Sequence, residues 1–426
     1  MLDVQFIRDH PDLIRRAIQQ KGTEDVSVVS SILEADQRHR STVTELQKIR
    51  TEANEESRKI GQLMGEGKKE AARIAMANSS ELKSRTKATE EQLREHEAIL
   101  NVLLLLVPNI PHTSVPVGKL PEDNRVVMEY GNLPELEFEP LPHWEIIEKY
   151  DLADFDRGSK VSGAGFPFYM GQGAKLQRAL INFFLDVAVR DGGYREIQSP
   201  LVINKASATG TGQFPDKEDM MYEVKRDGLF LIPTAEIPVT NYFRDDIIPE
   251  ADLPIKFCAY TPCFRREAGS YGKDVRGLNR IHQFDKVELV QFVHPDDSYE
   301  ALESLREDAE SILKMLELPY RRLLMCTGDM GFTQSKKYDL EVWSAGQKRW
   351  LEVSSISNFE SFQARRMQIR FRPTDGSKLK IVHTLNGSGL AVPRVVAALL
   401  ENNQTADGTV TIPDVLRPYT GFDTIC

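Results

Sequence analysis

The sequence lacks any long hydrophobic run. Its longest apolar stretch, Val102 to Val107, is far shorter than the about 20 residues that cross a bilayer as a helix. The amino-terminal region carries Asp3, Asp9 and Asp12, whereas transit peptides contain few acidic residues and the first part of a signal peptide is basic. We therefore expect a soluble, cytoplasmic protein with no membrane partner.

Cysteine is also scarce. The four cysteines, Cys258, Cys263, Cys326 and Cys426, form no Cys-x-x-Cys pair and have no histidine at ligand spacing. We predict buried or incidental thiols, and neither a structural zinc nor disulfides. The chain contains no Gly-x-x-x-x-Gly-Lys-Ser/Thr loop, which excludes a P-loop nucleotide site. It has no excess of positive charge either, and the net charge of −10 argues against indiscriminate nucleic-acid binding.

The chain does contain enough apolar residues, 41% of 426, for a sizeable core and two domains. Pro108, Pro111 and Pro116 end a helical region and mark a linker. We therefore assign residues 1–107 to an amino-terminal domain and residues 108–426 to a larger second domain.

The amino-terminal domain is predicted to be helical. After a lead-in of about 26 residues, apolar or small residues recur in steps of three, four or seven, which predicts a long helix with one narrow seam. The seam residues are Ile32, Ala35, His39, Val43, Leu46, Ile49, Ala53, Ile60 and Leu63.

A glycine-rich break and a second helical pattern follow this helix. Gly61, Gly65 and Gly67 interrupt the first helix, and the second begins near Lys68. The second seam is less regular, with Arg85 and His96 within it, and comprises Ile74, Leu82, Leu93 and Leu100. Two helices of matching length predict an antiparallel coiled-coil hairpin over residues 30–100, since each seam can bury itself on the other. A dimerisation coil is the alternative, although the glycine-rich tip favours a hairpin.

The second domain begins with helical patterns and continues mostly with strands. A helix is predicted from Ala174 to Arg190, and a strand from Tyr194 to Ser199 stops at Pro200. The strands that follow run consecutively, with one amphipathic helix from about Ser298 to Leu316. Because they do not alternate with helices, we predict an α+β fold with an antiparallel sheet.

The most informative stretch runs from Tyr260 to Asp285. Two strand-like segments flank a loop that contains Gly269, Gly272 and Gly277, so we predict antiparallel strands with a long connection. At the strand ends, Arg265 could offer a planar fork of donors to a phosphate, and Phe284 could offer a flat face to a base. The tetrapeptide Phe-Arg-x-Glu is short, however, and taken alone it favours an exposed Arg265 bridged to Glu267.

A second pattern lies far downstream. Residues 387–394, Gly-Ser-Gly-Leu-Ala-Val-Pro-Arg, predict a glycine-rich turn that leads to Arg394 at the start of a helix. These two patterns follow the helix, strand and proline of residues 174–200 in the chain. The three together, in this order, resemble the three signature motifs of class II aminoacyl-tRNA synthetases, and in this sequence the motifs would lie at about 174–200, 257–286 and 381–402. The string Thr-Leu-Asn-Gly-Ser-Gly-Leu at 384–390 is similar to the bacterial type of the seryl-tRNA synthetase family, and the resemblance covers essentially the whole chain.

The resemblance implies that the chain joins L-serine to AMP with ATP and transfers the seryl group to the 3′ end of tRNA(Ser). It implies a homodimer formed through residues 174–200, and Mg²⁺ held by Glu352 and Ser355. Those two residues would lie on opposite faces of a regular strand, so a bulge or strand end near Ser354 is required. Arg265 and Arg394 would be catalytic. The implied ATP-binding residues are Arg265, Arg266, Glu267, Phe284, Glu352, Val353, Ser354, Ser355 and Arg394.

The resemblance also implies a serine site. Its residues are Thr234, Ala235, Glu236, Glu288, Asn386 and Ser388. Glu288 lies between valine and leucine residues, and if it is buried it needs a cation, which the substrate ammonium would supply. The sequence leaves open which of Glu236 and Glu288 meets the ammonium and which meets the hydroxyl. At position 393 the family usually has a small residue, and a proline here is compatible with the first turn of a helix.

The hairpin is the implied tRNA-binding element. Residues 48–94 contain 11 Lys or Arg against 8 Glu, a mildly basic segment in an acidic chain. Candidate contacts are Arg50, Arg58, Lys59, Lys83, Arg85 and Arg94. Use of tRNA(Sec) is left open. The alternatives are a class II enzyme for threonine or proline, an aminoacyl-carrier-protein ligase, or an inactive RNA-binding relative.

Overall fold

The computed structural model describes residues 1–23, 25–267 and 276–426 in two compact units, Met1–Pro108 and Asn109–Cys426. The predicted loop glycines Gly269 and Gly272 lie outside the described residues. Within the described ranges, none of the helices combines the length and apolar character needed to span a membrane.

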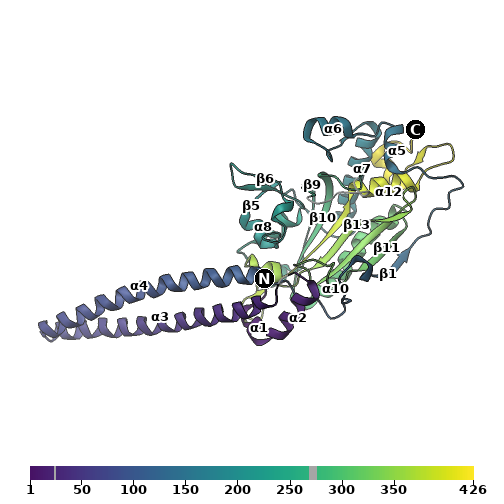
Figure 1. Cartoon of the computed structure of the whole chain (residues 1–426). Helices are drawn as coiled ribbons and strands as arrows, with labels where there is room; N and C mark the ends of the chain where they lie inside the picture. Colours follow the sequence, from purple (N-terminus) through teal and green to yellow (C-terminus); the bar gives the residue numbers. More distant parts are fainter. Residues whose placement is uncertain (24, 268–275) are drawn as a thin grey trace. The chain divides into compact units, whose positions relative to one another are not determined.

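The first unit is entirely helical. Two short helices, α1 (Val4–Asp9) and α2 (Pro11–Lys21), precede two long ones, α3 (Ser27–Gly65) and α4 (Lys69–Leu105). The long helices run side by side as an antiparallel hairpin (Figure 1). Thr42 Oγ1 lies 3.0 Å from His96 Nδ1, and Arg50 forms an ion pair with Glu90 at 2.8 Å. The predicted hairpin is confirmed, and His96 is accommodated in the seam by a polar partner.

Two details of the hairpin differ from the sequence prediction. Gly61 lies inside α3, so the helix continues to Gly65, because packing against α4 outweighs the cost of about 1 kcal/mol for a helical glycine. Ile74 is 58% exposed and does not belong to the seam. The buried residues of α4 are mostly small, which lets the two helices approach closely. They are Ala72, Ala75, Ser79, Thr89, Leu100 and Leu104.

The second unit contains a large antiparallel sheet, as predicted, and among its described strands only β4 and β9 pair in parallel. Its strands, in spatial order, are β1 (Arg125–Tyr130), β11 (Tyr320–Leu324), β12 (Lys336–Ser344), β13 (Arg349–Asn358), β16 (His383–Ala391), β10 (Gln283–Val293), β9 (Ile255–Phe264) and β4 (Arg195–Glu196). Sequence periodicity placed a strand at Tyr194–Ser199, and only its first part pairs with the sheet.

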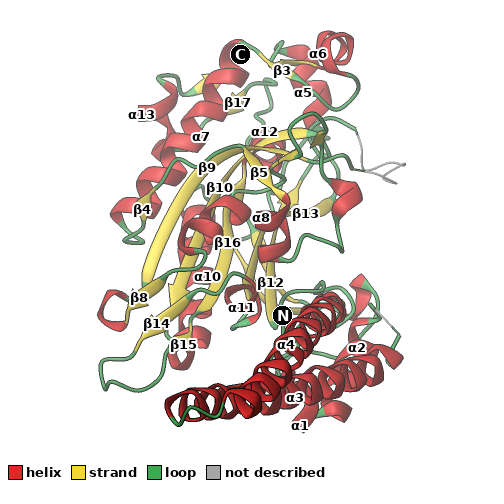
Figure 2. Ribbon diagram, turned by 90° about the vertical axis from the view of Figure 1, so that its left-hand side faces the viewer, coloured by secondary structure: helices red, strands yellow, loops and turns green. Residues whose placement is uncertain are grey.

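Three helices pack together against this sheet (Figure 2). They are α7 (Gly171–Arg190), α10 (Ser298–Met315) and α12 (Val392–Asn402). The predicted apolar face of α7 is buried, including Leu176, Leu180 and Phe184 at 0% exposure. It meets Val287 and Leu289 of β10, which alternate with residues on the opposite face of the sheet.

Smaller elements cover the opposite face, where Val290 and Phe292 of β10 pack against Ala235 and Val239. Two short helices there are α9 (Glu236–Thr240) and α11 (Phe362–Arg366). Because Lys286 and Glu288 share the strand face of Val290 and Phe292, they point to this side as well.

The remaining elements are α5 (His143–Lys149), α6 (Phe155–Ser162), α8 (Lys205–Thr211), α13 (Arg417–Thr420), β2 (Ala153–Asp154), β3 (Phe168–Tyr169), β5 (Val202–Asn204), β6 (Glu223–Val224), β7 (Leu229–Leu231), β8 (Ile247–Pro249), β14 (Arg370–Arg372), β15 (Lys380–Ile381), β17 (Val410–Thr411) and β18 (Thr424–Ile425).

Candidate active site

Arg265 and Phe284 meet at the end of the β9–β10 hairpin from which the connection between the two strands leaves. Phe284 pairs with Cys263, two residues before Arg265, so the strand register brings them together. The guanidinium carbon of Arg265 lies 5.0 Å from the centroid of the Phe284 ring, and its Nε donates to the carbonyl of Pro233 at 3.3 Å. The two groups predicted to meet the phosphate and the base of ATP are therefore in direct contact, and both are only partly buried.

Arg266 and Glu267 continue the chain from this point. Arg266 is exposed and donates from Nη1 to the carbonyl of Asp219 at 3.2 Å. Glu267 forms an ion pair with Arg280 at 3.0 Å, across the base of the connection. Its φ of +48° is uncommon for a residue other than glycine, which indicates a backbone held in place by its surroundings.

A buried polar cluster lies on the strand face that β10 shares with α9. Glu288 is 2% exposed and forms an ion pair with Lys286, which is 5% exposed. Thr234, which lies just before α9, donates from Oγ1 to Glu288 Oε2 at 3.2 Å and lies 2.8 Å from Lys286 Nζ. Both contacts of the carboxylate involve Oε2, which leaves its other oxygen for a ligand. Glu288 is thus buried, as its sequence context suggested, but its cationic partner is supplied by the chain itself.

A second carboxylate, Glu236, faces the same cluster. Glu236 is the first residue of α9 and follows the buried Ala235. Its Oε1 accepts a hydrogen bond from Gln363 Nε2 at 2.7 Å. Burial raises the pKa of Glu236, and the negative charge of Glu288 raises it further, while the Gln363 bond and Lys286 act in the opposite direction. Glu236 and Glu288 with Lys286 carry a formal charge of −1 when all are ionised, which an amino-acid ammonium would neutralise.

Strand β16 lines the cluster from the other side. Ser388 pairs directly with Glu288, and Asn386 pairs with Val290. The side-chain nitrogen of Asn386 is buried and has no hydrogen-bond partner among the residues that the structure describes. An unpaired buried donor is costly, so this position suits a ligand that accepts a hydrogen bond.

The sequence prediction of a glycine-rich turn at residues 387–389 is wrong. These residues lie within β16, which continues to Ala391. Its neighbours leave little space for side chains, because a Cβ on Gly387 would lie 3.2 Å from Ile356 and one on Gly389 would lie 3.3 Å from Val287. The backbone departs from regular geometry at Leu390, with a φ of +85°. This unfavourable conformation precedes the helix that carries Arg394.

Arg394 lies in the first turn of α12, and Pro393 is accommodated beside it near the helix start. Its Nε donates to the carbonyl of Asn279 at 3.1 Å, and its Nη1 donates to the carbonyl of Glu352 at 2.6 Å. The same nitrogen lies 3.8 Å from the Glu352 carboxylate. The arginine therefore connects α12, β13 and the segment that returns to β10.

The register of β13 shifts at Glu352 to Ser355. Glu352 pairs with Glu341 and Ser354 with Leu340, which leaves Val353 as an extra residue. The predicted irregularity near Ser354 is present as a bulge. Val353 and Ser354 are buried, and Ser354 Oγ donates to the carbonyl of Ser388 at 2.6 Å.

Asp339 of the neighbouring strand β12 lies at this bulge, opposite Ser355. Burial raises its pKa to about 7, opposed by Lys337 and reinforced by the negative charge of Glu352, and a hydrogen bond from Ser355 lowers it. Its Oδ1 has no hydrogen-bond partner within the described ranges. Glu352, Ser355 and Asp339 therefore provide oxygen atoms close together, the ligand type that Mg²⁺ prefers.

Both predicted arginines affect the carboxylate of Glu352, whose side chain is 48% exposed. Partial desolvation by the surrounding protein would raise its pKa, but Arg394, Lys337 and Arg265 outweigh this effect and lower it. Arg265 and Arg394 are 129 positions apart in the sequence. The structure therefore brings their positive charges to one region at the end of the sheet.

Two polar residues of this site were not anticipated from the sequence. Lys286 precedes Glu288 by two positions on one strand, so the period of two could have identified it as a neighbour. Asp339 lies 13 positions before Glu352 on another strand, and the sequence contains no signal that pairs them.

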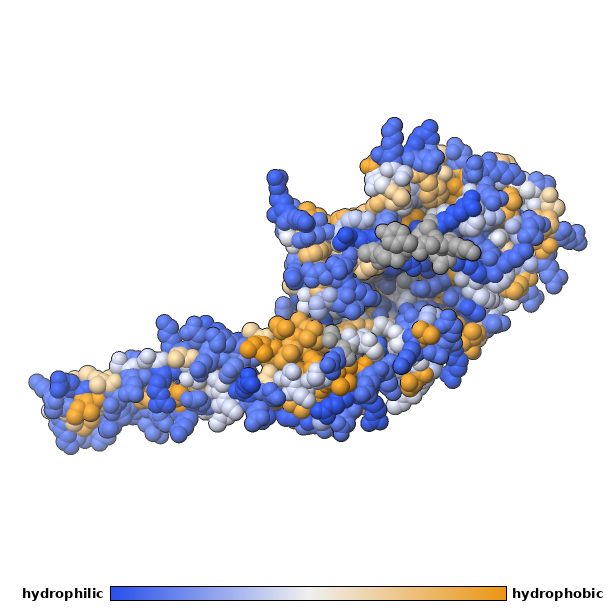
Figure 3. Space-filling view, viewed as in Figure 1, coloured by the Kyte–Doolittle hydropathy of each residue, from blue (hydrophilic) through white to orange (hydrophobic). Residues whose placement is uncertain are grey.

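The candidate tRNA-binding residues of the hairpin are all exposed, and the arm surface in Figure 3 is mainly hydrophilic. Three of them form ion pairs: Arg50 with Glu90 at 2.8 Å, Lys59 with Glu56 at 3.4 Å and Arg85 with Glu52 at 4.0 Å. Arg58, Lys83 and Arg94 form no ion pair with the described residues.

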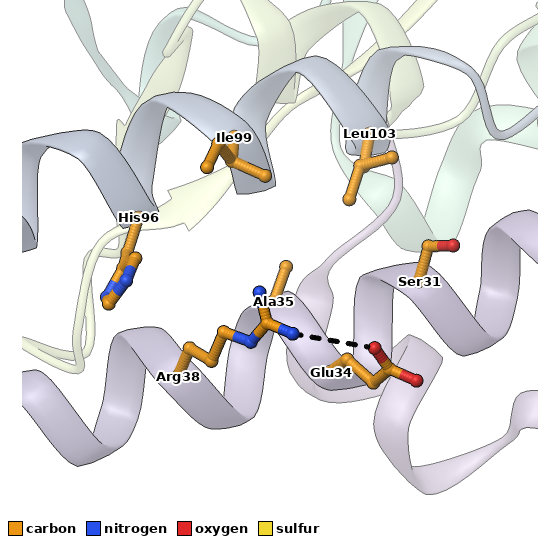
Figure 4. A pocket seen from close by; sticks show the side chains of 7 residues that line it. All are labelled: Ser31, Glu34, Ala35, Arg38, His96, Ile99 and Leu103. Carbon is orange, nitrogen blue, oxygen red and sulfur yellow. Dashed lines mark ion pairs between the residues drawn. The ribbon is translucent and has the colours of Figure 1, made fainter.

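A hollow of about 180 Å³ opens between α3 and α4 (Figure 4). Ala35, Ile99 and Leu103 form its apolar wall, and His96 lies at one end. Arg38 and Glu34 form an ion pair of 3.8 Å at its edge. None of the predicted site residues lines this hollow.

Comparisons with known proteins agree with the observed fold. Residues 1–111 match a family model described as the seryl-tRNA synthetase N-terminal domain, and residues 222–403 match the tRNA synthetase class II core domain (G, H, P, S and T). A serine–tRNA ligase of Salinibacter ruber is 57% identical over 422 residues, covering 99% of this chain and 98% of that protein.

Solved structures give the same result. A Pyrococcus horikoshii seryl-tRNA synthetase complexed with ATP superimposes with a TM-score of 0.93 at 37% identity, over 100% of this chain and 99% of the other. A cytoplasmic serine–tRNA ligase of Naegleria fowleri in complex with AMP gives a TM-score of 0.87 at 28% identity, over 100% and 98% of the two chains.

Proposed function

Since the chain belongs to the seryl-tRNA synthetase family, we propose that it activates L-serine with ATP and transfers the seryl group to the 3′ end of tRNA(Ser). The observation that carries the proposal is the buried polar cluster of Glu288, Lys286 and Thr234 on the sheet whose strand β10 also holds Phe284 against Arg265. Arg394 contacts Glu352 of β13 in the same sheet. One end of this site suits a triphosphate and the other suits a small zwitterion.

In the first step a serine carboxylate oxygen attacks the α-phosphorus of ATP, and the bond to pyrophosphate breaks. The carboxylate is already an anion, so no general base is required; the protein must align the groups and stabilise charge. We assign Arg265 to the α-phosphate, where its fork strengthens its hold as charge builds. Arg394 reaches the outer phosphates from the opposite side.

The adenine is assigned to the end of the β9–β10 hairpin. Phe284 stacks on the base, replacing part of its present contact with Arg265. Glu267 accepts a hydrogen bond from the adenine amino group, and Arg266 lies beside it as a further ATP contact. The bulge with Val353 and Ser354 lies below the ATP between the base and the phosphates. The hydrogen bond from Ser354 to the carbonyl of Ser388 holds this bulge in place.

Mg²⁺ is assigned to Glu352 and Ser355, where it would neutralise phosphate charge. The residues fit the ion, because Glu352 and Ser355 lie at one bulge and Asp339 Oδ1 beside them is buried without a partner among the described residues. Mg²⁺ usually keeps several waters and takes one or two carboxylates plus substrate phosphates, so a larger ligand cluster is not required.

Serine is assigned to the polar cluster around Glu288. Its ammonium and hydroxyl meet Glu236, Glu288 and Thr234, while Asn386 and Ser388 line the strand side. A buried site built to bond a hydroxyl rejects an analogue without one by about 10⁴-fold or more. This discrimination would separate serine from alanine.

The hairpin α3–α4 is assigned to tRNA(Ser). Phosphate contacts from its exposed basic residues would hold the RNA by backbone and shape, with the strong salt dependence of such contacts. The proposed contacts are Arg50, Arg58, Lys59, Lys83, Arg85 and Arg94. Recognition of tRNA(Sec) is a separate question for charging assays.

We also assign a homodimer to the edge of the sheet at β4. The strand has two residues and leaves an edge beside exposed apolar side chains, among them Val189 at 43%, Leu201 at 38% and Tyr242 at 55% exposure. A hollow of about 300 Å³, lined by residues 195–200 and Tyr242, opens there. Exposed apolar groups around an unpaired edge favour burial against a second copy.

The test is pyrophosphate exchange into ATP with each of the twenty amino acids. We expect exchange with serine, and exchange with alanine lower by at least about 10⁴-fold in kcat/KM. Equal or better exchange with another amino acid would replace the substrate assignment. No exchange with any of them, in protein that is folded and binds tRNA, would identify an inactive relative.

A further inference from the structure

We propose that His143 is a positioning residue that fixes the segment returning to β10 against α12 and thereby orients Arg394 for ATP. The inference rests on the proposed role of Arg394 in ATP binding. His143 is the first residue of α5, 251 positions before Arg394, and neither the sequence patterns nor the site residues described above include it.

The imidazole of His143 has one possible hydrogen-bonding arrangement. The backbone N–H of Leu278 points to its Nε2 at 2.8 Å, and Nδ1 lies 2.7 Å from Glu401 Oε1. A backbone amide can only donate, so Nε2 must be the acceptor and carries no hydrogen. Nδ1 therefore carries the proton and donates it to Glu401. The ring is neutral in this arrangement and links two elements through opposite nitrogens.

Glu401 provides a rigid support for this ring. Its Oε1 also accepts from the backbone N–H of His143 and from Gln347 Nε2, both at 2.9 Å. Its Oε2 accepts from Ser344 Oγ and from the backbone of Gly346 and Gln347. The side chains of His143 and Glu401 are 0% exposed. Such a fully bonded buried carboxylate holds its partners in one geometry.

The same segment contacts the arginine of the proposed ATP site. Asn279 follows Leu278, and its carbonyl accepts from Arg394 Nε at 3.1 Å. Arg394 and Glu401 are seven positions apart on α12, close to two turns, and so lie on one side of the helix. Helix α12 thus holds the segment at two points, directly through Arg394 and through His143 by way of Glu401.

Gly277 shows how closely the segment approaches the ring. Its φ is +64°, and a Cβ at this position would lie 2.3 Å from His143 Nε2. A side chain here would push the segment away from the imidazole. The contact between the backbone and His143 is therefore tight on the described side of the connection, at residues 277–279.

Two substitutions of His143 each preserve one of its two ring hydrogen bonds, the one with Leu278 or the one with Glu401. The amide oxygen of His143→Gln can take the place of Nε2 and accept from Leu278. The shorter side chain of His143→Asn can take the place of Nδ1 and donate to Glu401, but it cannot reach Leu278. Steady-state exchange kinetics with ATP and serine varied separately, together with the thermal midpoint of each variant, give the readout.

We expect His143→Asn to raise the KM for ATP by about tenfold or more, equivalent to about 1.4 kcal/mol, with the KM for serine changed by less than about threefold. His143→Gln should keep the KM for ATP within about threefold of the unsubstituted chain. Equal effects of the two variants, or a KM for ATP unchanged in both, would overturn the inference. Should His143→Asn fail to fold, Gly277→Ala provides the same test with the buried pair intact.

Arg394→Ala is the reference variant. If it leaves exchange unchanged, the proposed ATP site is wrong and the inference falls with it. If it impairs the use of ATP while His143→Asn and Gly277→Ala do not, the role of His143 alone is wrong.

Discussion

Lys286 forms a buried ion pair with Glu288, two positions along the same strand, and its Nζ lies 2.8 Å from Thr234 Oγ1. The cation that the buried glutamate requires is therefore part of the protein. We infer that Lys286 and Thr234 hold Glu288 through Oε2, so that its other carboxylate oxygen is available for serine. Removal of one partner of a buried pair typically costs about 3–5 kcal/mol.

The first prediction is that Lys286→Met destabilises the fold by about 3 kcal/mol and raises the KM for serine by at least about 30-fold, with the KM for ATP nearly unchanged. Without its cation, the buried Glu288 carboxylate loses the partner that compensates its charge and holds it in place for an ammonium. Denaturant unfolding and exchange kinetics measure the two effects. The double variant Lys286→Met/Glu288→Gln should recover stability but not serine use. Unchanged or tighter serine binding in Lys286→Met would contradict this role.

The second prediction concerns Glu236. Its pKa is raised above its ordinary value of 4.5, mainly by burial, so its stabilising contribution is present below that value and lost as pH rises through the raised pKa. Glu236→Gln removes this loss and should stabilise the ligand-free protein at pH 8 by about 1 kcal/mol, with a smaller gain at pH 4.5. The carbonyl oxygen can still accept from Gln363. Thermal unfolding at both pH values measures the gain, and the exposed Glu223→Gln is the control.

Glu236→Gln should at the same time abolish stabilisation by added serine. A variant that is less stable at pH 8, or that serine still stabilises as before, would show that Glu236 is a structural carboxylate rather than part of the serine site.

The third prediction concerns a histidine outside the site. Burial lowers the pKa of His383 from 6.5 to about 4, and its Nδ1 lies 2.9 Å from Ser298 Oγ. The unfolded chain takes up a proton below pH 6.5 while the folded chain does not, so this stabilising contribution is present above pH 6.5 and is lost as pH falls toward 4. The loss is at most about 3 kcal/mol, at about 1.4 kcal/mol per pKa unit.

His383→Gln should therefore flatten the fall in unfolding free energy between pH 6.5 and 4.5, as measured by urea denaturation. His112→Gln is a comparison, since burial also lowers the pKa of its imidazole but its contact with Ser114 is exposed to solvent. An equal slope in His383→Gln and the unsubstituted chain would assign the acid sensitivity to other groups.

The fourth prediction separates the two steps of the reaction. Replacing Lys48–Arg94 by a short glycine-rich turn should leave serine-dependent exchange within about threefold and lower tRNA charging by at least about 100-fold. The physical reason is that the hairpin supplies phosphate contacts whose loss weakens RNA binding. Joint charge reversal of Arg58, Lys83 and Arg94 is the milder variant, and joint substitution of Glu70, Glu81 and Glu91 by Gln is its control. Charging that survives the deletion would require another tRNA-binding surface.

The sequence predicted helices correctly where apolar residues recur at a regular spacing and the structure buries them. The face of α7 and the antiparallel hairpin followed from periodicity, because apolar side chains must be buried. The prediction that Gly61 interrupts the first helix was wrong, because one helical glycine destabilises a long helix by less than its packing against the partner helix stabilises it. Ile74 was assigned to the seam by its apolar character, whereas small residues allow the helices to approach.

The site was predictable only in part. Glu288 stood out as a charged residue among apolar ones, and its context indicated burial. Its pairing with Lys286 depends on burial of both side chains, which the sequence alone does not show. The link from His143 through Leu278 to Arg394 joins segments more than 100 positions apart, and no local pattern encodes it. The strand character of Gly387 to Gly389 depends on pairing with neighbouring strands, whose side chains leave little space for a Cβ at either glycine.

The most direct test of the central claim is serine-dependent pyrophosphate exchange by Arg265→Ala and Arg394→Ala, each verified to be folded and compared with the exposed control Arg372→Ala. If both arginines bind one ATP molecule, Arg265→Ala should lower kcat/KM for ATP by at least about 10³-fold and Arg394→Ala by at least about 10²-fold, whereas Arg372→Ala should remain near the unsubstituted value. Near-normal exchange in either site variant would contradict the account.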